Sequence, residues 1–436
     1  MSSMQLLPYK QQVSSLLRLG LPIVVGQLGM IILGLADTIM IGHHSTEELA
    51  AAAFVNNVFN LAIIFATGFS YGLTPLIGML QGGGNTQGIG RVFRNALAAN
   101  ASVAVLLTAV MYTVYCFVDK LGQPEELLPH IRPYFVLQLI SLLFIMLFNG
   151  FRQFAEGLTD TRTPMWILLG GNALNIFGNY LLIYGSFGFP EWGLFGAGVS
   201  TLVSRIVMLL VFIGVVAVAR RYKVYREAIL RSRFNRNDFM QLNALGWPIA
   251  LQMGMETAAF SLSAIMVGWL GSIPLAAHQI MISVSTIGFM VYYGMGAALA
   301  VRVSHFMGQK DFPNLRRAVN SGMGIILSLA IVASLFFYLA RTPIIYSFTE
   351  DHEVMIVVSS LIFSLIVYQF GDALQITFAN ALRGTTDVKP MMWIAFFSYF
   401  IVALPVGYLC GFTWGGGVVG VWVAFPAGLF TAGFLF

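Results

Sequence analysis

Three acidic side chains lie inside long apolar runs of the sequence: Asp37, Glu256 and Asp372. Glu256 lies near the middle of the run 245–270, which is long enough to cross a lipid bilayer. A chargeable group at that depth costs about 2.5–3.5 kcal/mol on membrane-insertion scales. Because a chain rarely carries such a cost without a use for it, these acids are the first candidates for chemistry.

A carboxyl group in an apolar span can be protonated, or it can be ionised and hold a small cation. Burial favours the neutral acid, and a nearby cation favours the charged one. Switching between these states would let an ion gradient drive a conformational cycle, and hard oxygen ligands suit Na⁺ or H⁺ rather than a transition metal. No basic residue stands clearly at a matching depth; the nearest candidate, Arg205, lies in a different span.

Polar side chains accompany the acids at helical spacing. Tyr368 precedes Asp372 by four residues and Gln375 follows it by three, so the three share one helix face. Gln252 stands one turn before Glu256. A further polar stripe consists of three asparagines in one span: Asn172, Asn175 and Asn179.

Each of these features also has a structural interpretation. A single intramembrane acid can serve as a hydrogen-bond partner, and the asparagine stripe can join helices. Three acids with polar stripes beside two of them favour a functional site over both interpretations. Most of the 36 Phe and 21 Met residues are interpreted as core and lipid contacts. Some could line a cavity for apolar cations, since an aromatic face attracts positive charge: Phe289, Tyr292, Tyr293 and Met253, together with Tyr368 and Gln252.

The composition is that of a helical membrane protein. Of the 436 residues 58% are hydrophobic and 9% are charged, with a mean hydropathy of +0.81, whereas a soluble protein carries roughly 25% charge. The apolar runs do not alternate as the strands of a barrel would. We therefore predict an all-α protein with twelve spans: 15–41, 50–80, 92–118, 131–155, 164–186, 194–219, 243–270, 275–306, 318–340, 354–381, 390–412 and 417–436.

The positions of the basic residues predict an N-terminus in the cytoplasm. With that orientation only three of the 23 basic residues lie outside, namely Lys120, Arg132 and Arg341, and Arg205 lies within a span. Seven basic residues crowd the connection 220–236. This is a strong positive-inside pattern. The basic connection is interpreted as a solvated linker, with binding of anionic lipid as the alternative.

An internal repeat divides the chain. At an offset of 226 residues, Gly20 matches Gly246 and Pro22 matches Pro248, and further matches continue through both halves. Each half holds six spans, so a pseudo-two-fold axis along the membrane normal should relate them. We predict an N-terminal half at 1–219, a basic cytoplasmic linker at 220–240 and a C-terminal half at 241–436.

Other features of the sequence add little. Cys116 and Cys410 lie far apart in apolar runs, and neither the cysteines nor the six histidines have metal-binding spacing. The N-terminus has no signal-peptide cleavage pattern, so the first apolar run is expected to remain as a membrane helix. The last run reaches Phe436 without a polar tail, and we expect a longer natural chain.

With these residues the whole chain resembles the multidrug and toxic compound extrusion (MATE) transporters, in their bacterial NorM-like branch. The resemblance rests on the twelve spans in two halves and on motifs of the sequence: DTIMIG from Asp37, NALNIFGNY around the asparagines, Glu256 and Asp372. It implies cation-coupled export of cationic, aromatic compounds across the inner membrane, with no cofactor besides the coupling ion, Na⁺ or H⁺. We expect a monomer in the lipid bilayer, with drugs or toxic organic cations as its partners and no nucleic acid.

The resemblance also implies two cation sites. Glu256 and Asp372 would frame one of them, holding Na⁺ if that is the ion, with Tyr368 and Phe289 close by. Asp37 would form the other with Asn175 and Asn179. Some relatives have Asp at the position of Asn179, so the second site has a single carboxylate here. A flippase for lipid-linked saccharides is the alternative function, although its cavity should be lined by basic residues. Neither a channel filter nor a P-loop or catalytic set is present in the sequence.

Overall fold

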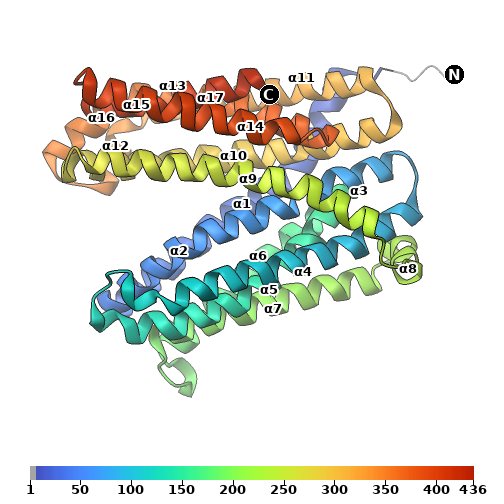
Figure 1. Cartoon of the computed structure of the whole chain (residues 1–436), viewed down its shortest axis with the longest axis horizontal. Helices are drawn as coiled ribbons and strands as arrows, with labels where there is room; N and C mark the ends of the chain where they lie inside the picture. The colour runs from blue at the N-terminus through green and yellow to red at the C-terminus, as the bar shows by residue number, and fades with distance from the viewer. Residues whose placement is uncertain (1–5) are drawn as a thin grey trace. The chain divides into compact units, whose positions relative to one another are not determined.

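The computed structural model describes residues 6–436, and all regular structure in that range is helical (Figure 1). Twelve helical segments in it are long and apolar enough to cross a membrane. Inside a bilayer the backbone must satisfy its own hydrogen bonds, which a helix does within one segment. The predicted fold class, an all-α membrane protein with twelve spans, is confirmed.

The chain forms two compact units. The N unit comprises residues 25–250, and the C unit comprises residues 6–24 together with 251–436. The boundaries fall inside two continuous helices, α1 (Tyr9–His44) and α9 (Arg236–Gly268). They are equivalent in the sequence repeat, since Val24 and Ala250 are 226 residues apart.

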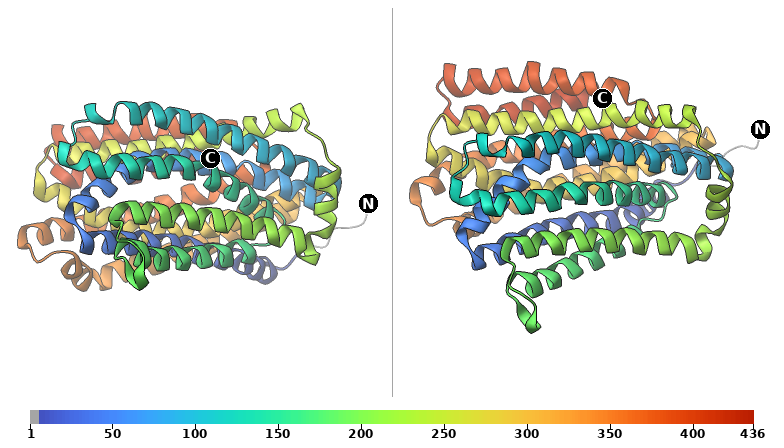
Figure 2. Two further views of the ribbon diagram at one scale, coloured as in Figure 1. Left: turned by 90° about the horizontal axis from the view of Figure 1, so that it is seen from below. Right: turned by 60° about the horizontal axis from the view of Figure 1, so that its bottom comes forward.

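The N unit is organised around α5, which packs against α2, α4 and α7, while α6 packs on α7. The connection between α6 and α7 projects beyond both helices (Figure 2). Besides most of α1 and the start of α9, this unit contains α2 (Thr46–Ser70), α3 (Leu73–Gly82), α4 (Thr86–Cys116), α5 (Leu128–Gly157), α6 (Arg162–Ile183), α7 (Gly193–Val218) and α8 (Lys223–Arg231).

The basic connection that the sequence predicts to be a linker is folded into the N unit. Its helix α8 packs on α4, where Gly90 comes so close that a Cβ there would lie 2.5 Å from the Ala228 carbonyl carbon. Arg91 Nε donates to Asp238 Oδ2 over 2.6 Å and ties α4 to the start of α9. The chain therefore passes from one unit to the other within α9, and not within this connection.

The C unit is organised around α13, which packs along α10 and against α11 and α17. Its spans include two π-helical turns, η5 (Phe397–Ala403) and η6 (Leu409–Thr413). Besides the start of α1 and the end of α9, this unit contains the α-helices α10 (Ser272–Gln309), α11 (Phe312–Leu339), α12 (Arg341–Phe348), α13 (His352–Thr385), α14 (Lys389–Phe396), α15 (Leu404–Tyr408), α16 (Gly417–Trp422) and α17 (Ala424–Leu435).

The sequence repeat is visible in the turns of the two halves. Before α4 the chain turns through Gly84 at φ 71°, and before α11 it turns through Lys310 at φ 58°. The next residues, Asn85 and Asp311, cap the two helices with their side chains. The two turn residues are 226 residues apart, and so are the two capping residues. The same turn and the same helix cap therefore occur in both halves.

Close packing also recurs in the repeat. A Cβ on Gly157 would lie 2.7 Å from Ile77, and a Cβ on Gly384 would lie 2.7 Å from Val303. Ile77 and Val303 are repeat partners, as are the two glycines. In each half the end of a long helix, α5 or α13, therefore packs against the equivalent residue of a second helix, α3 or α10. The contact is so close that a side chain in place of the glycine would not fit.

The same repeat explains why the unit boundaries fall inside helices. Gly20 of α1 packs closely against Met295 of α10, in the second half of the sequence. Gly246 of α9 packs equally closely against Phe69 of α2, in the first half. Because Met295 and Phe69 are also repeat partners, the two halves exchange the starts of their first helices symmetrically.

Candidate functional sites

In the C unit, α9 and α13 bring two of the three intramembrane acids into one polar site. Gln252 Nε2 donates to Glu256 Oε2 over 2.9 Å, one turn along α9. Gln375 Nε2 of α13 donates to the same oxygen over 3.2 Å. Glu256 and Asp372 are close enough to interact electrostatically. Two carboxyl groups from two helices thus belong to one site.

Asp372 is fully buried in this site. Its side chain is 0% exposed, and neither carboxyl oxygen has a hydrogen-bond partner within the described chain. Gln369, one turn earlier, is also 0% exposed with its amide unpaired. It fits there because Gly288 of α10 lacks a side chain: a Cβ would lie 2.9 Å from Gln369 Oε1. Buried polar atoms without partners are costly unless a ligand satisfies them.

Aromatic side chains close the site. The Tyr368 ring packs edge-on against Phe260 and Phe425, at centroid distances of 6.3 Å to each. Tyr399, from the π-helical turn η5, is buried and comes close to the Glu256 carboxylate. The Tyr292 hydroxyl of α10 is buried and interacts electrostatically with Asp372. Buried aromatic side chains with hydroxyl groups thus accompany both acids.

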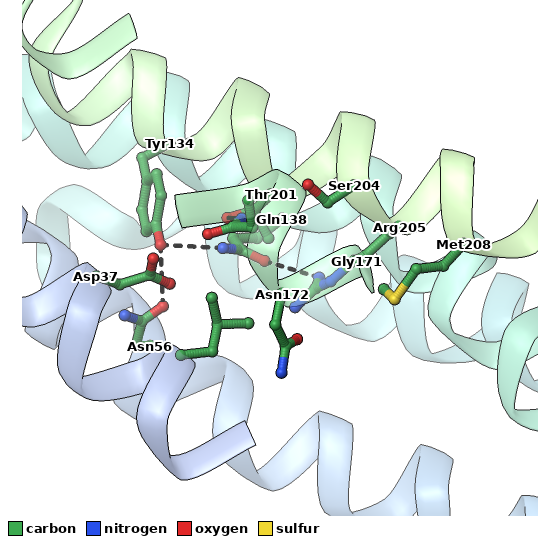
Figure 3. A pocket seen from close by; sticks show the side chains of 12 residues that line it. Asp37, Asn56, Tyr134, Gln138, Gly171, Asn172, Thr201, Ser204, Arg205 and Met208 are labelled. Carbon is green, nitrogen blue, oxygen red and sulfur yellow. Dashed lines mark hydrogen bonds between the residues drawn. The ribbon is translucent and has the colours of Figure 1, made fainter. Parts of the chain in front are cut away.

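The N unit holds the third acid in a cavity of about 120 Å³ (Figure 3). Asn179 Nδ2 of α6 donates to Asp37 Oδ1 over 2.6 Å. The amide of Asn175 can be oriented so that its nitrogen lies 3.0 Å from the same oxygen. Residues from α1, α2, α5, α6 and α7 line this cavity: Leu33, Asp37, Asn56, Tyr134, Gln138, Gly171, Asn172, Asn175, Thr201, Ser204, Arg205 and Met208.

The structure places Arg205 in the cavity of Asp37. Four cavity-lining residues of α7 share a helix face by their spacing, and Arg205 is one of them. Its guanidinium donates to Gln138 Oε1 over 3.1 Å and to Ser141 Oγ. The expectation that no basic residue stands clearly at a matching depth was therefore wrong for Asp37, and in the C unit Arg383 of α13 interacts electrostatically with Glu256. The reason is that α7 packs against α5 and α6, so residues from separate spans meet at one depth.

The predicted site residues divide into three groups. Glu256, Gln252, Asp372, Tyr368 and Tyr292 belong to the site of the C unit. Asp37, Asn172, Asn175 and Asn179 belong to the polar site of the N unit. Phe289 and Met253 are only partly buried, and the Phe289 ring packs on Tyr293 at a centroid distance of 5.6 Å.

Several polar residues were missed by the sequence reasoning. Gln369 and Tyr399 were missed in the C unit, and Tyr134 and Gln138 in the N unit. A buried ion pair was also missed, in which Arg152 Nε lies 2.7 Å from Glu156 Oε1 with both side chains at most 5% exposed. The signal for most of them was available, namely polar side chains one helical turn apart within apolar spans.

The donor set of the C unit suits a hard cation or a proton. Within residues 6–436 no three His, Cys, Asp or Glu side chains group as metal ligands. The oxygens instead come from two acids, glutamines and hydroxyls, a set that fits Na⁺ better than a transition metal. When bound, the cation would balance the charge of Asp372 and occupy its unpaired oxygens.

A helical chain with twelve candidate membrane spans, repeated halves and polar sites within those spans has the organisation of a membrane transporter. The chain belongs to the MatE family, whose model matches residues 22–181 and 248–409.

Relatives cover nearly the whole chain. The multidrug resistance protein NorM of Photobacterium profundum is 30% identical over 415 residues, which are 93% of this chain and 89% of NorM. The multidrug resistance protein PmpM of Pseudomonas aeruginosa is 33% identical over 93% of this chain and 85% of PmpM. A mutant of the Vibrio cholerae MATE transporter VcmN superposes with a TM-score of 0.87 over 98% of this chain and 95% of VcmN, at 17% identity, which shows the shared fold.

Proposed function

We propose that this protein is a secondary active multidrug exporter of a bacterial inner membrane, acting as a monomer. It exchanges Na⁺ or H⁺ for organic compounds, mostly cationic and aromatic, and moves them out of the cytoplasm by alternating access. The observation that carries this proposal is the carboxyl pair of Glu256 and Asp372, of which Asp372 is fully buried. Membership of the MatE family and the names of its multidrug resistance relatives support the substrate class.

The carboxyl pair supports coupling because its two states differ in charge. Asp372 is fully buried with both oxygens unpaired, so the isolated charge is costly there. A bound cation lowers that cost, and protonation removes it. The site therefore takes up an ion from the side where ions are abundant, and a drug competes with that ion for the unit that carries the acids.

The same acids argue against transport of lipid-linked saccharides. A cavity for a diphosphate group would need several cationic side chains to offset the phosphate charges. The N-unit cavity is lined by one arginine and one aspartate, and the C-unit site is centred on two acids with one arginine, Arg383, in electrostatic range of Glu256.

Transport by purified protein in vesicles tests the proposal. The vesicles are loaded with ethidium, a fluorescent aromatic cation, and a Na⁺ gradient or a H⁺ gradient is imposed separately. We expect one of the two gradients to accelerate ethidium movement across the membrane, and protein-free vesicles to show the background leak. Equal ethidium movement with and without each gradient would exclude cation-coupled export.

The proposed orientation places the connection 220–236 in the cytoplasm. Arg233 is exposed there, and Ser45 lies at the opposite end of the N-unit helices. In a background with Cys116 and Cys410 replaced, Ser45→Cys should react with a membrane-impermeant thiol reagent on whole cells. Arg233→Cys should react only after lysis, and the reverse labelling pattern would contradict the orientation.

A further inference from the structure

The basic connection 220–236 has features that a solvated linker does not need. It contains seven basic residues and one acid, Glu227. A solvated linker requires neither a fixed conformation nor exposed apolar side chains. This connection has both, since its helix α8 packs on α4 and large apolar residues are exposed among its cations. Neither feature has a role in the export scheme above.

Helix α8 is held on the N unit by one of its sides. The Tyr225 hydroxyl donates to Gln81 Oε1 over 2.8 Å. The Tyr222 hydroxyl, just before the helix, donates to Asp160 Oδ2 over 2.6 Å. The packing of α8 on α4 leaves no room for a side chain at Gly90. The conformation of α8 is therefore fixed by contacts with α3, with α4 and with the turn before α6.

Helix α8 lies across the ends of the neighbouring helices of the N unit. Figure 2 shows it in both views as the light-green helix at the right-hand end. Helices that span a bilayer are tilted on average by only about 20° from its normal, so a helix across their ends runs along the membrane surface. Since α8 begins a few residues after the span α7 ends, it lies near the lipid headgroups. Interfacial amphipathic helices occupy this position.

The outer side of α8 combines cations with apolar side chains. Five exposed residues share this side by their helical spacing: Lys223, Val224, Glu227, Leu230 and Arg231. Val224, Leu230 and the following Phe234 are each at least 60% exposed. Apolar side chains on one face, next to Lys and Arg, are typical of a helix that dips into a membrane interface.

Few of the cations in this connection are paired with acids of the protein. Within residues 6–436 only Arg221 of the seven forms an ion pair, with Asp160 at 3.0 Å. Six of the seven are arginines, whose forked N–H groups match the oxygens of a phosphate group. Basic residues gathered next to a membrane span are attracted to anionic headgroups, and the attraction offsets their mutual repulsion.

We propose that α8 and residues 232–236 form a surface that binds anionic phospholipids of the membrane. The arginines contact the lipid phosphates, and Val224, Leu230 and Phe234 lie among the upper parts of the acyl chains. A zwitterionic lipid offers the same acyl chains without the net charge, so the surface selects lipids by charge. The proposal rests on the proposed function only for the leaflet, because the orientation of an exporter places this surface on the cytoplasmic side.

Fluorescence quenching by brominated lipids tests this selectivity. In a background with Cys116 and Cys410 replaced, Glu227→Cys carries a bimane label on the outer side of α8. The protein is placed in vesicles of equal parts phosphatidylglycerol and phosphatidylcholine, with the acyl chains of one lipid or the other brominated. We expect brominated phosphatidylglycerol to quench the label about twofold more strongly than brominated phosphatidylcholine, and the difference to shrink at high salt.

Two matched double variants separate this surface from the net charge of the protein. Arg231→Gln/Arg233→Gln should make the two brominated lipids quench almost equally. Arg316→Gln/Lys389→Gln removes two exposed basic residues from other connections and should keep the preference. Since all four side chains are exposed, both variants should keep the parental Tm, which confirms that they are folded.

A second pair of substitutions tests the apolar contacts. Leu230→Ser combined with Phe234→Ser should weaken quenching by both brominated lipids, because the label then lies farther from the acyl chains. The preference for phosphatidylglycerol should remain, because the arginines are unchanged.

Three results would overturn the proposal: absence of quenching in the parent, equal quenching by the two lipids, or a preference that survives Arg231→Gln/Arg233→Gln. Each would leave the connection a solvated linker or a surface without lipid selectivity. Failure of gradient-driven ethidium export with the lipid preference intact would instead contradict the proposed function alone.

Discussion

The two polar sites occupy the same repeated scaffold but are built differently. In the C unit a fully buried Asp372 has both oxygens unpaired and a second acid near it. In the N unit Asp37 accepts a hydrogen bond from Asn179 and shares its cavity with Arg205. The first site thus holds two acids, one of them without hydrogen-bond partners, and the second holds one acid and one arginine.

The repeat itself shows where this difference arose. The repeat partner of Asp37 is Ser263, and that of Glu256 is Met30. Turns, caps and close-packed glycines are kept between the halves, because the backbone path depends on them. The three acids inside the spans are not kept, although charges elsewhere such as Arg91 and Arg317 are, because each unit needs only its own electrostatic balance. A duplicated scaffold can therefore hold two sites of different chemistry.

The largest effect that this comparison predicts is on transport. Asp372→Asn and Glu256→Gln each fix a coupling group as neutral while keeping its size. Either variant should slow gradient-driven ethidium efflux by about tenfold or more, and the double variant should be little worse, because the two acids act as a unit. Efflux from vesicles measures the rates, and Tm confirms that the variants are folded.

A matched control comes from the other site. Asp37→Asn should impair efflux through a loss of stability, with Tm falling, whereas the two C-unit variants should keep Tm at or above the parent value, since neutral amides cost less to bury than ionised acids. Parental efflux by Glu256→Gln under the same gradient would make Glu256 a structural residue and remove the main contrast between the units.

The fold followed from the sequence because lipid imposes a simple rule. Long apolar runs must be helices, and twelve such runs were predicted and are present. The acids were equally apparent, since three charges stand out in apolar spans. The side-chain partners of Glu256 were partly predictable. Gln252 lies one turn away on the same helix, and Gln375 lies on the same helix face as Asp372.

A second prediction concerns the buried ion pair, which only the N unit has at this position. Arg152 and Glu156 pair at 2.7 Å in α5, whereas the repeat partner of Glu156 is Arg383. Glu156→Gln should destabilise the protein by about 3–5 kcal/mol, because it leaves a buried arginine without its acid. Thermal or denaturant unfolding measures the loss. Arg152→Met with Glu156→Leu, which removes both charges, should be far less harmful, and equal losses for the two variants would show that the charge is not the cause.

The contacts between spans could not be read from the sequence. Arg205 meets Gln138 and Ser141 over separations of 67 and 64 residues, and no helical period reports such pairs. For the same reason, the sequence did not show that the two halves exchange the starts of their first helices. It depends on which residues fit against Gly20 and Gly246, and a repeat pattern identifies equivalent positions without saying which half they pack on.

A third prediction tests whether the scaffold is equally tight in both units. Gly157→Ala and Gly384→Ala would place a methyl group within 3 Å of neighbouring helices in each case. Each should cost about 1–3 kcal/mol, because a rigid close-packed contact must open. Gly170→Ala is the matched control, since nothing lies within 4 Å of its added Cβ. The free energy of unfolding of the three variants measures this cost. If Gly157→Ala lowered it and Gly384→Ala did not, the halves would differ in packing as well as in charge.

The smallest predicted effect lies at the repeated helix caps. Asn85 Oδ1 accepts from Gly88 N over 2.9 Å at the start of α4, and Asp311 Oδ1 accepts from Asn314 N over 3.2 Å at the start of α11. Asn85→Ala and Asp311→Ala should each cost about 1 kcal/mol, since each leaves a backbone N–H at the helix start without its acceptor. Asp311 should cost more of the two, because its other oxygen also accepts from the Asn314 side chain over 2.7 Å and its negative charge favours a helix N-terminus. Asp311→Asn isolates the charge: it should recover most of the loss of Asp311→Ala if the cap is mainly a hydrogen bond. An Asn85→Ala loss well above that of Asp311→Ala would mean that the two caps, although equivalent in the repeat, no longer support their helices in the same way.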